Sequence, residues 1–417
     1  MAYLTFNEKE VPVYDMQTWK NDLYPKNYSF KYPKAGEKNA SVQLCLYDLE
    51  TEKTSILLDE TEHYLLKIQW INTNEFVVER LNRLQNKLEV LKINVLTQEK
   101  TLIYEESSNE YVEVVEQQSY FSEDYFLISS EKSGFRHLYL YDYQGKKIKQ
   151  LTKGDWEIDH LNYVNEKTTK IYYTSTEKSF SERHLYEIDF DGKNKIQLTK
   201  EEGVHRIKMS SNGLYFIDYY SSSQKPLQVV LQKIGESKQI FLEQNQELQT
   251  KLKEQDIIYP ESFSFTNSEG IKLNGWMMKP KKIKRRQKCP VLMFVYGGPG
   301  YQTVLNKWGG INFLWYQLLV EKGYVIVSVD GRGTGGRGAK FKKSTYGQLG
   351  NLEYTDQIET ANYLKTLPFI DENCLGIWGW SFGGYVSSLC MTKGNGIFKM
   401  GIAVAPVTNW RFYDSMY

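Results

Sequence analysis

The sequence predicts a β-propeller followed by a largely parallel β-sheet with helices on both faces. Two observations carry this prediction: a repeat of about 47 residues in the first part of the chain, and buried strands alternating with amphipathic helices in the second part. We divide the 417 residues into a partial propeller, 1–250, and a second domain, 251–417.

The repeat is clearest where residues 136–153 match residues 183–200 at 11 of 18 positions. Weaker copies place an Asp or Asn turn at positions 48, 94, 142 and 189, and a fifth hairpin is expected at 227–242. In each copy alternating apolar residues run into the turn, which is typical of a hairpin. Units of this length predict propeller blades, about four to five of them. A sandwich of unrelated hairpins is the alternative.

The composition excludes several classes of partner. Lys and Arg number 52 against 51 Asp and Glu, so the net charge of +1 provides no field for nucleic acid, and we expect none to bind. Four cysteines without a CxxC pair predict neither a zinc site nor a disulfide framework. No apolar run reaches the roughly 18 residues that cross a bilayer, and the residues after Met1 show neither the basic nor the apolar region from which a leader sequence would be predicted.

The second domain begins with a predicted hairpin at 262–280. A helix is clearest at 354–367, and the basic run 281–288 is expected to be a solvated loop. Four further strands are expected at 290–298, 324–330, 374–380 and 399–407. Continuous apolar strands separated by amphipathic helices predict a sheet that is covered on both faces.

The motif Gly379-Trp380-Ser381-Phe382-Gly383 follows one of these strands and precedes a helical segment. This is the nucleophile elbow of an α/β-hydrolase domain, in which a sharp turn presents a serine and nearby side chains must be absent. Ser381 is the predicted nucleophile. Tyr296 precedes a Gly-Gly-Pro turn after an earlier strand, and with the N–H of Phe382 it is expected to form the oxyanion hole. The alternative for the motif is a glycine-rich turn that only packs, and the alternative for Tyr296 is an aromatic side chain that only packs.

Residues 333–338 formally fit GxGxxG, with Glu353 at about the distance of a ribose-binding acid. However, no helix is predicted to open on these glycines, and Glu353 falls at a helix start. We therefore expect no dinucleotide, and neither another cofactor nor a metal ion.

A base for Ser381 is missing from the expected place. In this topology the acid and the histidine follow the serine, whereas the five histidines precede it, at 63, 137, 160, 184 and 205. His137 and His184 occupy equivalent repeat positions and are interpreted as blade architecture. We expect that the chain is truncated after the elbow and the next strand, that strand 399–407 lies at an edge, and that the chain alone is inactive.

The segments FNEKEVPVYD, YPKNYSFKYPKAG, DGRGTGG, DQIE, GWSFGGYV and GIAVAPVTNWRFYDSMY resemble, in order, those of the prolyl oligopeptidase family of serine peptidases, most closely its dipeptidyl peptidase IV branch. The resemblance implies a nucleophilic Ser381 with Tyr296 and Phe382 at the oxyanion hole. It also implies a proline-sized S1 pocket lined by Val407, Trp410, Tyr413 and Tyr417, whose aromatic walls suit a flat, apolar ring.

The resemblance further implies release of Xaa-Pro or Xaa-Ala dipeptides, a homodimer, and a location outside the cytoplasm. The glutamate pair that grips the substrate amine in that family has no counterpart here. Arg136 and Arg183 repeat each other, so a structural role is expected for Arg136. Two alternative functions remain: that of a prolyl oligopeptidase or acylaminoacyl peptidase, and that of a non-catalytic propeller scaffold that binds peptides.

Overall fold

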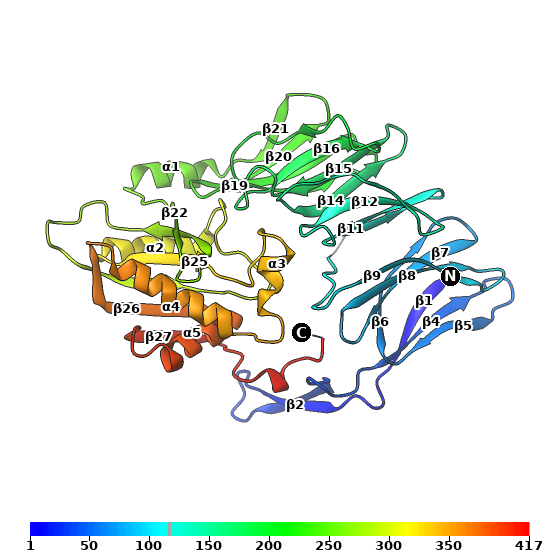
Figure 1. Cartoon of the computed structure of the whole chain (residues 1–417), viewed down its shortest axis with the longest axis horizontal. Helices are drawn as coiled ribbons and strands as arrows, with labels where there is room; N and C mark the ends of the chain where they lie inside the picture. The colour runs from blue at the N-terminus through cyan, green and yellow to red at the C-terminus, as the bar shows by residue number, and fades with distance from the viewer. Residues whose placement is uncertain (116–117, 417) are drawn as a thin grey trace.

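The first half of the chain is a series of small antiparallel sheets set along an arc (Figure 1). The computed structural model describes residues 1–115 and 118–416. Four of the sheets have four consecutive strands each, as propeller blades do, and a fifth sheet has three. The four-stranded sheets are β6 (His63–Trp70), β7 (Glu75–Asn82), β8 (Lys87–Asn94) and β9 (Lys100–Ser107); β10 (Ser119–Phe121), β11 (Tyr125–Ser130), β12 (His137–Asp142) and β13 (Lys147–Gln150); β14 (Ile158–Asn165), β15 (Lys170–Ser175), β16 (His184–Asp189) and β17 (Ile196–Gln197); and β18 (Val204–Met209), β19 (Tyr215–Ser222), β20 (Lys225–Lys233) and β21 (Gln239–Glu243). The predicted propeller is confirmed.

The three-stranded sheet contains β1 (Ala2–Asn7), β4 (Ser41–Tyr47) and β5 (Thr54–Glu60). Its hairpin and those of the next three sheets turn at the repeated Asp or Asn. The side-chain oxygens of Asp48, Asn94 and Asp142 each accept two backbone N–H groups two to four residues later, at 2.8–3.1 Å. Such a side chain replaces a backbone partner within the turn, which explains the repeat of this residue type.

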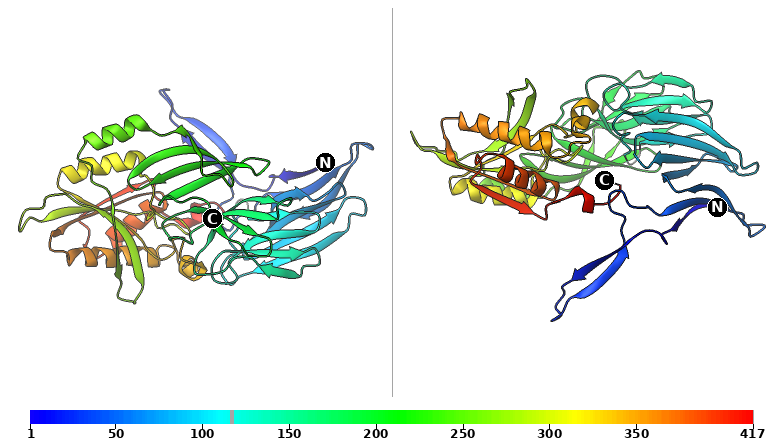
Figure 2. Two further views of the ribbon diagram at one scale, coloured as in Figure 1. Left: turned by 90° about the horizontal axis from the view of Figure 1, so that it is seen from above. Right: turned by 60° about the horizontal axis from the view of Figure 1, so that its bottom comes forward.

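A separate hairpin, β2 (Val13–Thr18) with β3 (Lys26–Lys31), leaves the first sheet and projects from the molecule (Figure 2, right). Its two strands pair only with each other within the described part of the chain.

The second half is built on one six-stranded sheet in the order β22-β23-β25-β24-β26-β27. The last four strands in this order are mutually parallel, and β23 runs antiparallel to β25. The strands are β22 (Glu261–Thr266), β23 (Lys272–Met278), β24 (Cys289–Phe294), β25 (Val325–Asp330), β26 (Ile370–Trp380) and β27 (Met400–Val404). The predicted hairpin and four further strands are confirmed.

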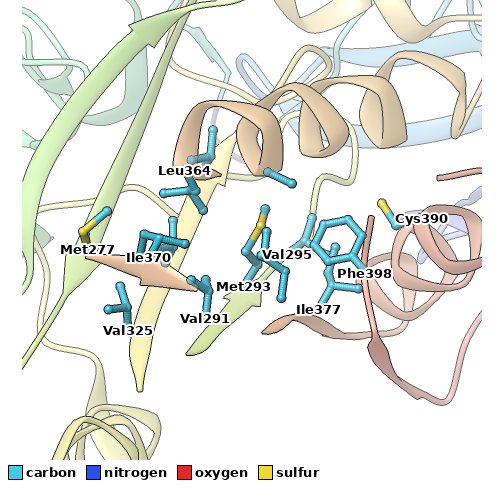
Figure 3. Packing of buried hydrophobic residues seen from close by; sticks show 14 of the residues in the cluster. Met277, Val291, Met293, Val295, Val325, Leu364, Ile370, Ile377, Cys390 and Phe398 are labelled. Atoms are coloured by element: carbon cyan, nitrogen blue, oxygen red, sulfur yellow. The ribbon is translucent and has the colours of Figure 1, made fainter. Parts of the chain in front are cut away.

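Helices cover both faces of this sheet, which explains the continuous apolar runs of its strands. They are α1 (Gln246–Glu254), α2 (Gly310–Glu321), α3 (Ala339–Lys342), α4 (Asn351–Lys365) and α5 (Phe382–Lys393), with short 3₁₀ turns η1 (Lys343–Thr345) and η2 (Trp410–Phe412). One face packs Val291, Met293 and Ile377 against α4 and α5 (Figure 3). The opposite face packs Leu292 and Ile326 against α2.

The change from small sheets to the large sheet occurs between Glu243 and Glu261, with α1 between them. Leu252 of α1 packs in the cluster of the large sheet, and we propose that the domain boundary lies in this interval. The basic run 281–288 is an exposed loop between β23 and β24. In the part of the chain that the structure covers, no helix is both long enough and apolar enough to cross a membrane.

Candidate active site

Ser381 stands between the end of β26 and the first residue of α5, at φ 55° and ψ −117°. This conformation is strained for a residue with a side chain, and such strain persists only where the surroundings enforce it. The Ser381 N–H donates to the Val404 carbonyl at 2.9 Å, and its carbonyl accepts the Tyr385 N–H at 3.0 Å. The turn is therefore held from β27 and from α5, and the serine lies at the carboxyl edge of the sheet.

The two glycines of the motif are required by close backbone contacts. A Cβ on either Gly379 or Gly383 would collide with the carbonyl oxygen of Val295, and one on Gly383 would also lie 3.0 Å from the Cα of Tyr296. The elbow and the segment after β24 thus touch backbone to backbone. This contact places the Tyr296 backbone beside the elbow.

Tyr296 is half-buried, and its ring centroid lies 6.2 Å from that of Phe382 and 4.6 Å from that of Tyr301. Burial raises the pKa of Tyr296, and the nearby Tyr301 and Tyr413 raise it further. Its hydroxyl is therefore protonated at neutral pH and able to donate a hydrogen bond. The N–H of Phe382 belongs to the first turn of α5, where N–H groups lack partners within the helix and the dipole favours negative charge.

Three of the four residues expected in the S1 pocket are half-buried in the segment that follows β27. Trp410 packs on Phe382 at 5.5 Å between ring centroids, on Tyr385 at 5.4 Å, and on Tyr413 at 5.8 Å. Val407 lies in the segment between β27 and η2. Tyr417 lies outside the described residues. Trp410 and Tyr296 thus both pack on Phe382, the residue that follows Ser381, and Tyr413 packs on Trp410.

The segment that carries Tyr413 is held by the beginning of the chain. The Ala35 N–H donates to the Tyr413 carbonyl at 2.9 Å, and the Ser415 N–H donates to the Pro33 carbonyl at 3.0 Å. These contacts have no pattern in the sequence, because they join residues about 380 positions apart.

The glycine-rich loop 333–338 docks on the propeller. The N–H groups of Gly336 and Gly338 donate to the two carboxylate oxygens of Glu157, at 3.2 and 2.8 Å, and the Ala339 N–H donates to the Gly134 carbonyl at 2.8 Å. The helix that follows has only four residues. The loop therefore uses its amides to bind a protein carboxylate between the two halves of the chain.

Beside this loop, buried charges join the two halves. Lys342, only 2% exposed, contacts Glu113 and Glu131 at 2.5 Å each, and Arg136 contacts Glu113 at 3.3 Å. Burial acts to raise the pKa of Glu131, but the ammonium groups of Lys342 and Lys343 outweigh it and lower the pKa. The predicted structural role of Arg136 agrees with its place in this cluster.

The loop after β25, residues 331–333, contacts residues 356–359 of α4. The guanidinium of Arg332 binds both carboxylate oxygens of Asp356, at 2.8 and 3.1 Å, and its backbone N–H donates to the same group at 2.7 Å. Burial lowers the pKa of Arg332, but the hydrogen bonds that its guanidinium donates to Asp356 and Glu269 outweigh this effect and raise it. The pair ties the loop after β25 to α4.

Glu353 lies in the first turn of α4, 2% exposed, with its Cβ against Gly297 of the segment that carries Tyr296. Its Oε2 accepts the Gly350 N–H at 3.0 Å, whereas its Oε1 has no partner among the described residues. Burial raises the pKa of Glu353 to about 7, and the negative Asp356 adds to this shift. Glu353 caps α4, and its predicted place at a helix start is confirmed.

The five histidines are engaged inside the propeller. His137 and His184 begin β12 and β16, and each lies within 3.3 Å of a threonine hydroxyl fifteen residues later. The other three contact carboxylates, namely Glu60, Asp159 and Asp218. Within residues 1–115 and 118–416, no histidine hydrogen-bonds to the Ser381 side chain.

Comparison with known families matches both halves of the chain. Residues 1–227 match the dipeptidyl peptidase IV N-terminal region, and residues 312–417 match the prolyl oligopeptidase family. Dipeptidyl peptidase 4 of Trichophyton tonsurans and that of Arthroderma otae are each 32% identical over 437 residues, which cover the whole chain and 56% of the relative. The chain thus spans slightly more than half the length of these relatives.

A solved structure is similar throughout. The crystal structure of Porphyromonas gingivalis dipeptidyl peptidase 4 matches the whole chain and 59% of its own length, with a TM-score of 0.95 and 38% identity. The similarity extends over both the propeller blades and the sheet that carries Ser381.

Proposed function

Because the chain belongs to the dipeptidyl peptidase IV family, within the prolyl oligopeptidase family of serine peptidases, we propose that its protein releases N-terminal dipeptides through Ser381. The strained serine at the β26–α5 turn is the observation that carries this proposal. Such a turn is costly to the fold and is retained where a hydroxyl must be presented to a substrate.

In the proposed reaction the Ser381 Oγ attacks the carbonyl carbon that follows the second substrate residue. The Tyr296 hydroxyl and the Phe382 N–H donate hydrogen bonds to the oxyanion that forms. A histidine of the protein at its natural length takes the Ser381 hydroxyl proton during the attack and delivers it to the amine as the C–N bond breaks, and water then hydrolyses the acyl ester and restores the serine. Val407, Trp410, Tyr413 and Tyr417 would receive a proline or alanine side chain before the cleaved bond.

The proposal includes a limit on the isolated chain. Each of its five histidines makes its polar contacts within the propeller, none hydrogen-bonds to the Ser381 side chain among the described residues, and a serine without a base is a poor nucleophile. We expect the 417-residue chain alone to show no peptidase turnover. Turnover by this chain that disappears in Ser381→Ala would contradict this expectation.

The test of the function uses the protein at its natural length. Peptides that begin Ala-Pro or Ala-Ala should lose a dipeptide, whereas the same peptides with an acetylated N-terminus should not. Cleavage of the acetylated peptides would favour an oligopeptidase or an acylaminoacyl peptidase. Binding without cleavage of either set would favour a peptide-binding scaffold.

We also propose that the protein forms a homodimer in which the β2–β3 hairpin contacts a second copy. The hairpin exposes large apolar side chains, including Trp19 at 68%, Leu23 at 84% and Tyr24 at 77%. An exposed apolar patch on a two-stranded arm marks a protein interface, since such a hairpin is barely stable alone. Sedimentation of the protein at its natural length should give the mass of a dimer. The double variant Trp19→Ser, Leu23→Ser should sediment as a monomer. A variant that still sediments as a dimer would place the interface elsewhere.

A further inference from the structure

A cavity of about 900 Å³ lies between the propeller and the second domain. The propeller lines it with loops that include Ser181 and Gln224, and the second domain lines it with Trp276, Trp308 and Tyr316. Its volume is in the range of sites that bind small molecules or short peptide segments. None of the residues assigned above to the nucleophile, the oxyanion hole or the S1 pocket lines this cavity.

Within the described residues, the cavity wall contains a polar atom without a partner. Tyr316 is 5% exposed and lines the cavity, and its hydroxyl makes no hydrogen bond. Burial raises its pKa, so the hydroxyl is protonated and can donate. Buried polar groups in proteins are almost always paired, and an unpaired one in a cavity wall points to a ligand. By contrast, the neighbouring Trp276 donates to the Thr303 carbonyl at 3.2 Å.

The position of the cavity follows from the strand order. The parallel strands place their carboxyl ends at one edge of the sheet, where Ser381 follows β26 and Tyr296 follows β24. The S1 residues follow β27, on one side of the serine. The cavity lies on the other side, at β23 and β22.

The oxyanion segment connects the serine with the cavity. Tyr301 lines the cavity, and its ring lies 4.6 Å from that of Tyr296. Three strand spacings separate β26 from β23, which is roughly 14 Å. An extended peptide covers this distance with about four residues.

We propose that this cavity binds the part of the peptide substrate that follows the cleaved bond, from about the fourth residue onward. This inference rests on the proposed function and adds a second recognition site to it. With the residue before the cleaved bond held at the β27 side, the substrate crosses Ser381 and continues past Tyr296 and Tyr301 into the cavity. The Tyr316 hydroxyl donates to a backbone carbonyl of that segment.

The lining suits an uncharged peptide backbone with apolar side chains. Hydroxyl and amide groups from Ser181, Gln224 and Asn312 can exchange hydrogen bonds with peptide groups, while the rings of Trp308 and Tyr301 provide apolar contact. The carboxylate of Glu182 in the wall is already engaged by His184 and Asn306. The lining also contains Glu202 and Lys307, whose charges are opposite, so this pair adds no net charge and the wall suits a neutral segment.

The test measures kcat/KM on the protein at its natural length, with Ala-Pro peptides that carry about two to about eight neutral residues after the cleaved bond. The value of kcat/KM should rise as the segment after the cleaved bond lengthens from about three to about five residues. The ratio of kcat/KM for the longest peptide to that for the shortest should therefore exceed unity. In Asn312→Trp, a ring placed in the cavity from α2 should lower this ratio to about one. Ile311→Trp is the matched control, because Ile311 is 84% exposed on the same helix and does not line the cavity.

A second variant, Tyr316→Phe, removes only the unpaired hydroxyl. It should lower the ratio about two- to tenfold, the value of one hydrogen bond. A wild-type kcat/KM that does not depend on peptide length would overturn the cavity proposal. So would a ratio that both Asn312→Trp and Tyr316→Phe leave at the wild-type value. Absence of cleavage of the shortest peptide would instead overturn the proposed function.

Discussion

Glu353→Gln should make the protein more stable at high pH and leave it nearly unchanged at low pH. Glu353 is buried beneath Gly297 of the oxyanion segment, with one carboxylate oxygen unpaired. Burial raises the pKa of Glu353 from 4.5 to about 7, so the folded protein keeps this proton over a range in which the unfolded chain has lost it.

The sign and size follow from proton linkage. Between pH 4.5 and about 7 the folded state binds more protons at this group, so its contribution to the free energy of unfolding falls as pH rises and is constant above about 7. At about 1.4 kcal/mol per pH unit, the total is about 3 kcal/mol. Glutamine carries no charge and keeps an oxygen for the Gly350 N–H, so it avoids most of this cost.

The assay is thermal unfolding of the wild type and of Glu353→Gln between pH 4.5 and pH 8.5. The difference in Tm should be small at the acid end, grow with pH, and level off near pH 7. Glu372→Gln is the control, because Glu372 is exposed. A Tm difference for Glu353→Gln that does not change with pH would refute the reasoning.

Three further predictions concern other contacts. In the protein at its natural length, Gly383→Ala forces Val295 away from the elbow and should lower kcat by about 100-fold or more, measured by steady-state kinetics; near wild-type kcat would refute it. Lys342→Met leaves Glu131 buried without its closest cation and should cost about 3–5 kcal/mol, seen as a lower Tm, whereas an unchanged Tm would refute it. In the 417-residue chain, Ile402→Lys places a charge on the exposed strand β27 and should reduce self-association in sedimentation; an unchanged distribution would refute it.

The features that the sequence predicted depend on residues close together in the chain. Apolar alternation and the repeated turn at Asp48, Asn94 and Asp142 predicted the hairpins, because strand period and turn chemistry are local. The elbow was predicted for the same reason, since its strand, glycines and helix are contiguous.

The features that the sequence did not predict join distant segments. Glu157 binds the loop at Gly336 and Gly338, and residues near Ala35 hold Tyr413. Neither pairing has a pattern in the sequence, because it depends on how the blades and the sheet pack together. The loop instead resembled a nucleotide-binding motif, whose glycines serve a similar purpose of presenting backbone amides to an anion.

The role of Ser381 is tested most directly by labelling the protein at its natural length with a fluorophosphonate, followed by peptide mapping. The reagent forms a covalent bond only with an activated serine. We predict a single modified residue, Ser381, and an Ala-Pro peptide should slow its labelling. The substitution Ser381→Ala should abolish both the labelling and dipeptide release. Dipeptide release that persists with Ser381 unmodified, or after Ser381→Ala, would contradict the proposed mechanism.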